Sequence, residues 1–386
     1  MKVLAVLYPD PAGGYPPQYA RDSIPVIDRY PNGQTTPTPS GLDFTPGELL
    51  GSVSGELGLR GFLEAAGHKL VVTSDKDREG SDFDGELASA DVVISQPFWP
   101  AYLTRERIEA APNLRLAITA GIGSDHVDLD AAIEHGITVA EVTFSNSISV
   151  AEHTVMMILA LVRDYLPQWQ VVKDGGWDIA DVVSRSYDLE GMHVGAFGAG
   201  RIGTAVLRRL KPFDVHLHYT DKHRLPPEVE AELGVEWHET VQDMVPQCDV
   251  VTIHAPLHHE TEGLFDEALL GTMRRGAYLV DTARGKICDR DAVVRALESG
   301  QLAGYAGDVW FPQPAPPDHP WRTMPHHGMT PHTSGTSLSA QARYAAGTRE
   351  ILECFLEGRP IRDEYLIVDG GALAGAGAHS YTAGGR

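Results

Sequence analysis

Three polar residues follow strand-like segments late in the chain, where their side chains could act on a small molecule. Arg284 follows "AYLVD", Gln313 lies in "GDVWFPQPAP" after a strand-like run, and His332 follows "GMTP". Each residue alone fits an ordinary surface role. Ligands of doubly wound sheets bind at the carboxyl ends of parallel strands, so the three side chains are predicted to converge on one cleft. An enzyme that moves a proton would place a carboxylate where Gln313 stands.

A glycine-rich segment predicts the cofactor. "GAFGAGRIG" contains Gly198, Gly200 and Gly203 in G-x-G-x-x-G spacing, between the strand-like "MHVGAF" and the helix-like "RIGTAVLRRL". These glycines allow a tight turn and leave helix N-terminal amides free to bind a pyrophosphate. Asp221 follows at the end of the next strand-like run, where its carboxylate can accept hydrogen bonds from a ribose and would repel a 2′-phosphate. The pattern predicts a dinucleotide site that favours NAD over NADP.

The elements that carry these residues alternate between short apolar runs and longer amphipathic ones, which predicts an α/β fold with two doubly wound parallel sheets. A helix is expected over 46–67, and another begins near Ser147 with an apolar run at 155–162 that should be buried on all sides. After a long helix from about 339 to 358 we expect no further strands. The predicted domains are a catalytic domain at 1–146, a nucleotide-binding domain at 147–335, and a segment at 336–386 that returns to the first domain, with the active-site cleft between the two domains.

Composition limits the partners. The 386 residues carry a formal charge of −22, which repels nucleic acid and anionic lipid surfaces. No run approaches about 18 consecutive apolar residues, and the N-terminal apolar stretch is too short for a secretory signal. Three scattered cysteines predict neither disulfides nor a cysteine metal site and indicate a cytoplasmic protein. His216 and His218 share a strand face, but no Cys, Asp or third His lies at ligand spacing from them in the sequence, so no metal site is predicted.

The order of GxGxxG, Asp221, "TARG", "GDV" and "TPH" resembles the D-2-hydroxyacid dehydrogenase family. Longer strings, including "NSISVAEH", "GDVWFPQPAP", "DHPWRTMP" and "GRPIRDEYLIV", are similar to one branch of it, the NAD-dependent formate dehydrogenases, over nearly the whole chain. That resemblance implies oxidation of formate to carbon dioxide by direct hydride transfer to NAD⁺, in a homodimer.

Gln313 distinguishes this branch from the rest of the family. Hydroxyacid dehydrogenases have a glutamate there that supports a histidinium, because making a ketone from an alcohol removes a proton as well as a hydride. An amide gives His332 no such ionic support. Oxidation of formate releases only the C–H hydride, so an amide suffices.

The resemblance also assigns individual residues. Arg284, His332 and Gln313 are the predicted catalytic residues, with Arg284 binding the formate carboxylate. Substrate contacts are predicted for Asn146, the Ile122 backbone amide, and an apolar wall of Pro97 and Phe98. The predicted NAD contacts are Ser147, Gly198, Gly200, Arg201, Ile202, Gly203, Asp221, Pro256, His258, Glu260, Thr282, Asp308, Ser334, Gly335 and Ser380.

The sequence leaves two alternatives open. A true 2-hydroxyacid dehydrogenase would reduce glyoxylate or hydroxypyruvate faster than it oxidises formate, and Gln313 argues against it. An NAD-sensing interaction protein, like the co-repressors built on the same fold, would also keep Arg284 and His332. The segment "PFWP" together with Asn146 and Gln313 favours a small substrate pocket.

Overall fold

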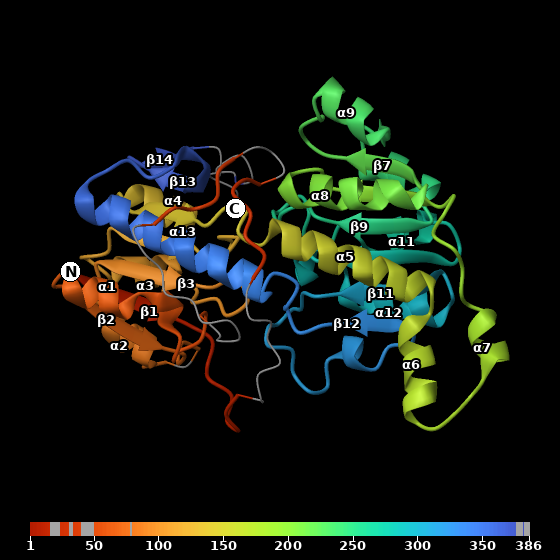
Figure 1. Ribbon diagram of the computed structural model, residues 1–386, viewed down its shortest axis with the longest axis horizontal. Helices are drawn as coiled ribbons and strands as arrows, with labels where there is room; N and C mark the ends of the chain where they lie inside the picture. The colour runs from red at the N-terminus through yellow and green to blue at the C-terminus, as the bar shows by residue number, and fades with distance from the viewer. Residues whose placement is uncertain (16–23, 31–33, 40–49, 78, 376–380, 382–386) are drawn as a thin grey trace. The chain divides into compact units, whose positions relative to one another are not determined.

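The computed structural model describes residues 1–15, 24–30, 34–39, 50–77, 79–375 and 381. The chain divides into two compact units, one formed by 1–146 with 335–386 and the other by 147–334. Each unit is built on a seven-stranded sheet with helices on both faces (Figure 1). Within the described residues, no helix is both long and apolar enough to cross a membrane.

The sheet of the first unit has the strand order β14-β13-β5-β4-β3-β1-β2, and β1 to β5 are parallel. One face is covered by α1 and α13 and the other by α2, α3 and α4. The elements are β1 (Lys2–Val6), α1 (Arg60–Ala65), β2 (Lys69–Thr73), α2 (Asp82–Leu87), β3 (Val92–Ser95), α3 (Arg105–Glu109), β4 (Leu116–Thr119), α4 (Leu129–Glu134), β5 (Thr138–Glu141), α13 (Leu338–Glu357), β13 (Leu366–Asp369) and β14 (Ala372–Leu373).

Two sequence expectations for this unit are wrong. The chain does form strands after α13, because β13 pairs antiparallel with β5 and then with β14. The helix expected over 46–67 is only a short 3₁₀ turn at 56–58 followed by α1, because Leu57 and Gly58 have positive φ angles of 53° and 67° that stop a continuous helix. Residues 46–49 lie outside the described part of the chain.

The second unit has the strand order β12-β11-β10-β9-β6-β7-β8, all parallel. Its cores lie on both sides of the sheet, under α5 and α8 on one face and under α10, α11 and α12 on the other. The elements are α5 (Ser147–Val162), α6 (Tyr165–Lys173), α7 (Ile179–Val183), β6 (His193–Phe197), α8 (Arg201–Leu210), β7 (His216–Thr220), α9 (Pro227–Leu233), β8 (Val235–Trp237), α10 (Val241–Met244), β9 (Val250–Ile253), α11 (Glu267–Thr272), β10 (Ala277–Asp281), α12 (Arg290–Glu298), β11 (Leu302–Gly307) and β12 (His327–Met329).

The apolar sequence of α5 predicted that this helix is buried on every side, and this prediction is wrong. Ala151, Ile158 and Val162 pack in the core with α8, but Met156 is half-exposed. The helices α6 and α7 form an arm that extends away from the sheet of this unit (Figure 1). The sheet has the strand order of a dinucleotide-binding domain: β6, β7 and β8 follow one another toward one edge, and β9 to β12 follow one another toward the other, so the order switches between β6 and β9 while all strands stay parallel.

Candidate active site

The three predicted catalytic residues follow three neighbouring strands of the second unit. Arg284 comes three residues after β10, Gln313 six residues after β11, and His332 three residues after β12. Neighbouring strands lie about 4.8 Å apart, so the ends of β10 and β12 are separated by only about 10 Å. Gln313 Oε1 lies 2.9 Å from His332 Nδ1, in hydrogen-bond contact. The predicted pairing of this amide with this imidazole is present, and both side chains are half-buried.

Asp308 fixes the loop that presents His332. Its carboxylate is fully buried and accepts hydrogen bonds from the backbone amides of Thr333 and Ser334, each at 2.8 Å, and from the Thr330 hydroxyl at 2.5 Å. His332 itself has a φ angle of +58°, in the left-handed region that non-glycine residues rarely adopt. The hydrogen bonds on both sides of His332 hold the backbone in this conformation.

The loops after β10, β11 and β12 are also packed directly against one another. The Trp310 indole donates a hydrogen bond to the Thr330 carbonyl at 2.8 Å. A Cβ atom at Gly285 would lie 2.8 Å from the Trp310 carbonyl carbon, so only glycine lets the Arg284 loop approach this closely. The Arg284 guanidinium, half-buried, donates to the Ala283 carbonyl at 2.7 Å. The three predicted catalytic residues therefore sit on one connected loop surface.

The glycine-rich loop after β6 has the shape that a dinucleotide needs. Gly198 has a φ of +94°, and a Cβ there would lie 2.5 Å from the Ala255 amide nitrogen. A Cβ at Gly203 would lie 2.0 Å from the Gly198 carbonyl oxygen, so a side chain at either glycine would force the closely packed backbone to shift. A Cβ at Gly200 would meet no atom within 4 Å. The first turn of α8 has no side-chain cap, which leaves amides and open space for a pyrophosphate.

Asp221 is anchored at the tip of β7 beside this loop. Its carboxylate accepts hydrogen bonds from the backbone amides of Ala199 at 2.7 Å and His223 at 2.8 Å. These bonds link the acid to the glycine-rich loop and orient it. The neighbouring Lys222 forms an ion pair with Glu260 at 2.5 Å. Glu260 is one of the residues predicted to contact NAD, and in this structure its carboxylate is paired with Lys222.

The other predicted cofactor residues are distributed over both units. In the second unit, Thr282 is buried and its hydroxyl lies 3.1 Å from that of Thr154. Arg201 and Ile202 begin α8, and the loop that carries Pro256 and His258 is held by the Thr261 hydroxyl. Ser147 begins α5, and its buried hydroxyl has no partner among the described residues. The Ser334 backbone amide donates a hydrogen bond to the Asp308 carboxylate. Gly335 belongs to the first unit, and Ser380 lies outside the described residues.

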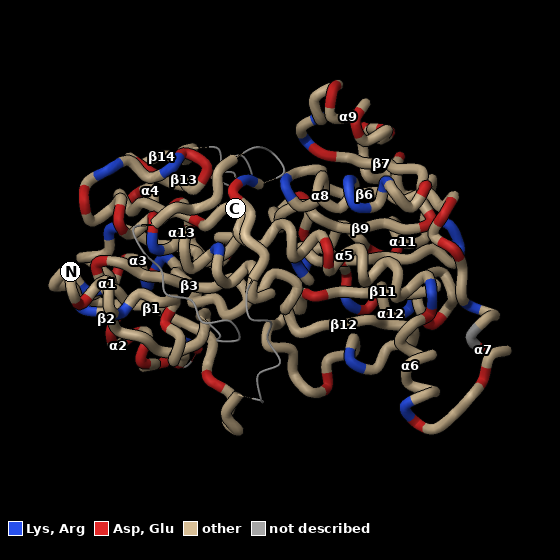
Figure 2. Tube along the Cα trace, viewed as in Figure 1, with Lys and Arg blue, Asp and Glu red and all other residues tan. Residues whose placement is uncertain are grey.

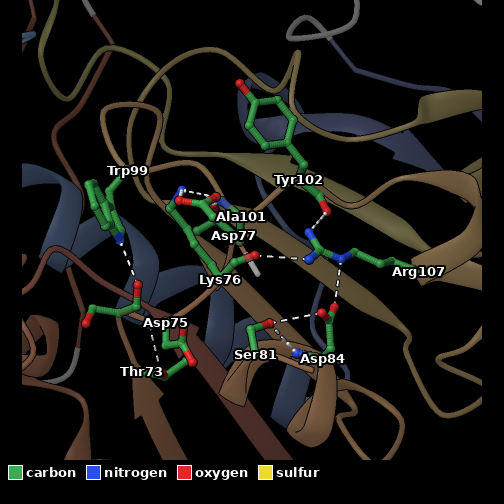
Figure 3. A network of polar contacts seen from close by, with 12 residues as sticks. Thr73, Asp75, Lys76, Asp77, Ser81, Asp84, Trp99, Ala101, Tyr102 and Arg107 are labelled. Carbon is green, nitrogen blue, oxygen red and sulfur yellow. Dashed lines mark hydrogen bonds and ion pairs between the residues drawn. The ribbon is translucent and has the colours of Figure 1, made fainter. Parts of the chain in front are cut away.

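Pro97 and Phe98 lie on a loop of the first unit that is held by a polar network (Figure 3). Trp99 donates its indole N–H to the Ser74 carbonyl at 3.3 Å, and the Lys76 ammonium lies 4.6 Å from the Trp99 ring centroid. Lys76 is buried and paired with Asp77 at 2.7 Å. The network is completed by Arg107, which bonds to Asp84, to the Tyr102 carbonyl and to the Lys76 carbonyl. The loop is therefore firmly placed within its own unit.

Glu141 organises the loop that contains Ile122. This buried carboxylate accepts hydrogen bonds from the Gly123 amide at 3.0 Å, the Ser124 hydroxyl at 3.2 Å and the Tyr381 hydroxyl at 3.0 Å. A Cβ at Gly121 would lie 2.8 Å from the Pro97 ring, so this loop packs against the Pro97 loop. In the same unit, a Cβ at Gly335 would lie 2.6 Å from the Asn146 amide nitrogen. The Asn146 side-chain oxygen is buried and has no hydrogen-bond partner among the described residues.

The sequence did not single out Glu141, Lys76 or Arg107 as supports of these loops. Glu141 is the last residue of an apolar strand, and a carboxylate that is only 2% exposed there marks a structural anchor. That position could have been noticed, because Glu141 directly follows the buried apolar residues Val139 and Ala140. Lys76 and Arg107 carry no such signal, since charged residues after a strand or in a helix are usually solvated.

The sequence showed no third candidate ligand near His216 and His218, but the structure places two such residues beside His218. His238 and Glu236 lie beside His218, and ligand atoms of these three residues all lie within 4.8 Å of one another. The sequence separation of 20 residues hid the contact, which results from the parallel pairing of β7 and β8. His216 is not part of this group.

Comparison with known proteins supports the dehydrogenase interpretation. Residues 155–334 match the model for the NAD-binding domain of the D-isomer specific 2-hydroxyacid dehydrogenases. The chain is also 72% identical over 383 residues to a formate dehydrogenase of Pseudomonas sp. (strain 101), covering 99% of this chain and 96% of that relative. The chain belongs to the formate dehydrogenase branch of this family. A chloroplastic and mitochondrial formate dehydrogenase of Arabidopsis thaliana is 50% identical, covering 84% of this chain and 85% of that relative.

Solved formate dehydrogenases have the same fold. A formate dehydrogenase of Granulicella M. superposes with a TM-score of 0.95 at 70% identity and covers 97% of this chain and 100% of that one. An NAD-dependent formate dehydrogenase of Staphylococcus aureus, solved in complex with NAD, gives a TM-score of 0.79 at 43% identity over 97% of this chain and 100% of that one. The predicted fold class of two doubly wound α/β domains is confirmed.

Proposed function

We infer that this chain oxidises formate to carbon dioxide with NAD⁺ as the hydride acceptor. The observation that carries this function is the Gln313–His332 hydrogen bond on the strand-end surface that also bears Arg284. The high identity to formate dehydrogenases supports it. NAD⁺, when bound, supplies an acceptor for the two electrons and the hydrogen of the formate C–H bond. The open face at Gly200, the uncapped start of α8 and the oriented Asp221 carboxylate fit that cofactor.

The amide of Gln313 lets His332 act without a change of charge. In the structure His332 Nδ1 faces the amide oxygen, and the Nδ1–H group can donate to it. The amide can also turn over and donate to Nδ1, which leaves the hydrogen on Nε2 of a neutral ring. A carboxylate could only accept. His332 can therefore donate a hydrogen bond to an anionic substrate while it remains neutral, and no proton has to leave the site.

Arg284 is proposed to bind the formate carboxylate. A guanidinium presents two parallel N–H groups to a carboxylate, and this fork holds a small anion in a single orientation. Loss of the hydride converts the anion to neutral carbon dioxide, so fixed dipoles at a site that excludes water favour the change. Asn146, the Ile122 amide and the apolar side chains of Pro97 and Phe98 are proposed to complete the substrate contacts. Their firm anchoring within the first unit supports these roles.

Arg284→Lys tests this function. Lysine keeps the positive charge but loses the fork, so kcat/KM for formate should fall by about 10- to 100-fold, the effect expected for losing a charge-assisted hydrogen bond. The rate is measured as NADH formation from formate, and NAD affinity is measured separately by fluorescence titration. NAD binding should remain unchanged. A variant with full activity would exclude Arg284 as the formate ligand.

The alternative of a 2-hydroxyacid dehydrogenase is tested in the same assay. A D-lactate dehydrogenase of Aquifex aeolicus, solved with NAD and lactic acid, has the same fold at 26% identity and a TM-score of 0.70. The Gln313 amide favours formate over such substrates, because it gives His332 no counter-charge. Faster reduction of glyoxylate or hydroxypyruvate than oxidation of formate would favour the alternative. A chain that binds NAD but acts on neither substrate would favour the sensing protein.

We also propose that the protein is a homodimer that pairs through the α6–α7 arm. More than half of the exposed large apolar side chains among the described residues fall within 165–187, and α6 is largely uncharged (Figure 2). Trp169 is 49% exposed and Trp177 is 82% exposed. A pocket of about 440 Å³ lies at the base of the arm and is lined by Asp164, Arg185 and Tyr187 among others. We propose that a second copy of this chain covers the exposed apolar side chains of the arm. A cytoplasmic location remains a prediction.

A further inference from the structure

A row of histidines crosses the edge of the second sheet, away from the loops that carry the proposed reaction. His193 Nδ1 lies 2.8 Å from His218 Nε2, and His218 Nδ1 lies 3.0 Å from His238 Nε2. The Glu236 carboxylate lies 3.7 Å from His218 Nδ1. His218 and His238 are buried, at 4% and 9% exposure, whereas the Glu236 side chain is 69% exposed.

Parallel pairing brings these residues together. In the register of β7 and β8, His218 lies opposite Glu236, and the His238 amide continues the pairing by donating to the Tyr219 carbonyl at 2.9 Å. Residues two apart in a strand point to the same face. Glu236 and His238 therefore share the face of His218. On β6, His193 lies on that face as well, because it pairs with His216, two residues before His218.

We propose that His218 Nδ1, His238 Nε2 and the Glu236 carboxylate bind one divalent transition-metal ion of the zinc class, with water as a further ligand. All three ligand atoms already lie within 4.8 Å of one another. Tetrahedral zinc with bonds of about 2.0–2.1 Å requires ligand atoms about 3.4 Å apart. The two imidazole nitrogens need to separate by only a few tenths of an ångström. The exposed Glu236 side chain is free to rotate onto the ion.

The surroundings of His218 match those of a metal ligand. A histidine that binds a metal through one nitrogen usually donates its other ring N–H to an acceptor, which fixes the ring. His218 Nε2 has such a partner in His193 Nδ1 at 2.8 Å. The strand β8 is the last strand of the sheet, so an ion can reach the ligands from solvent on the Glu236 side. Arg274, whose positive charge acts on His193, is paired with Asp249 at 2.8 Å.

Without an ion, the same contacts are hydrogen bonds between neutral imidazoles. The two distances fit a tautomer of His218 that donates from Nε2 to His193 and accepts at Nδ1 from His238. Binding of the ion replaces the hydrogen between His218 and His238, and His238 remains neutral by carrying its proton on Nδ1 instead. No redox change or net proton transfer is needed. The site lies along β7 before Asp221 and not on the loops of Arg284 and His332, so the expected effect is on stability of the sheet edge.

The experiment uses the full chain after treatment with EDTA and dialysis. Zinc chloride binding is measured by titration calorimetry, and cobalt(II) is added separately to record its visible d–d absorption. We expect one strong zinc site per chain, a cobalt spectrum typical of low-coordinate nitrogen and oxygen ligands, and a raised melting temperature with zinc. His238→Gln should weaken zinc binding by about tenfold or more, since it removes a ligand and not merely an outer-shell partner.

Two further variants keep the inference falsifiable. Glu236→Gln alters an exposed side chain that does not hold the fold, and it should also weaken zinc binding several-fold. His216→Gln changes an exposed histidine on the same face outside the trio, and it should bind zinc like the parent chain. The site is refuted by a folded parent chain that takes up no zinc at about 100 µM. It is equally refuted by His238→Gln and Glu236→Gln variants that bind as well as the parent.

Discussion

At the scale of single residues, the Gln313 amide forms a hydrogen bond with the His332 ring that does not require a charge on the ring. Gln313 carries no charge, so its contact with His332 is a hydrogen bond and not an ion pair. The geometry depends on Asp308, which holds His332 in its left-handed conformation through backbone bonds on the adjoining residues. The position of His332 is thus set by backbone and amide hydrogen bonds and not by an ionic pair.

The variant Gln313→Glu should introduce a new ionisation at this pair, because it replaces an amide, which does not titrate, with a carboxyl group. A carboxylate beside His332 favours the imidazolium and raises its pKa. The profile of kcat/KM for formate against pH should then show a new ionisation from the coupled Glu–His pair. Gln313→Asn serves as the neutral control, since it shortens the side chain without adding charge and should lower the rate without a new pH step. Identical profiles for parent and Glu variant would contradict the role of the amide.

A second residue-scale prediction concerns Asp281, the buried last residue of β10. Burial raises the pKa of its carboxyl from the ordinary 3.8 to about 7. The folded state therefore keeps a proton that the unfolded state has already lost between about pH 4 and 7. The contribution of Asp281 to stability is highest below about pH 4, declines as pH rises through this window, and stays at its lowest above pH 7.

Asp281→Asn removes this dependence while it keeps an oxygen to accept the Ala283 amide, which bonds to Asp281 at 2.9 Å. Denaturant unfolding at pH 5 and at pH 8 should show that the variant gains stability relative to the parent at the higher pH. The difference between the two pH values is the diagnostic quantity. Equal effects at both pH values would show that the carboxyl is not protonated in the folded chain.

At the scale of elements, the loop from β6 to α8 is constrained by contacts of its own backbone. Gly198→Ala should destabilise the fold by about 2 kcal/mol, because an L-residue costs 1–2 kcal/mol in left-handed backbone and the new Cβ would also crowd the Ala255 amide. NAD affinity should fall with it. Gly200→Ala is the matched comparison, since its Cβ would meet no protein atom, so it should weaken NAD binding with little loss of stability. Thermal unfolding without NAD, together with NAD titration, separates the two effects.

Elements with strong local signals could be predicted from sequence, and those made by tertiary pairing could not. The glycine-rich loop has a strand before it and a helix after it, so its place was evident, as were the strands that precede Arg284 and His332. In contrast, β13 has only four residues and two glycines follow β13, so its strand character depends on pairing with β5. His238 was missed for the same reason, because its neighbour His218 lies on another strand. The positive φ angles at Leu57 and Gly58, which prevent one continuous helix before α1, have no sequence signature other than the glycine at 58.

At the scale of the whole molecule, the exposed arm predicts association. The parent chain should sediment at twice the mass of a single chain, since Trp169 and Trp177 leave large apolar surfaces uncovered. Trp169→Glu combined with Trp177→Glu should shift the protein towards monomers, because association would bury the new charges. Val26→Glu, at an exposed apolar residue of the other unit, is the control and should stay dimeric. Analytical ultracentrifugation over a concentration series distinguishes the outcomes, and a parent that is monomeric throughout would refute the dimer.

The two backbone bonds of Asp221 have a practical consequence for redesign. Any attempt to make the enzyme accept the phosphorylated cofactor begins by removing this negative charge. The same carboxylate, however, ties Ala199 and His223 to the tip of β7. Substitution by alanine would relieve the repulsion and untie the loop at once, whereas serine or asparagine keeps an acceptor for at least one of the two amides. With the phosphorylated cofactor, variants with serine or asparagine at position 221 should therefore have higher turnover than the alanine variant.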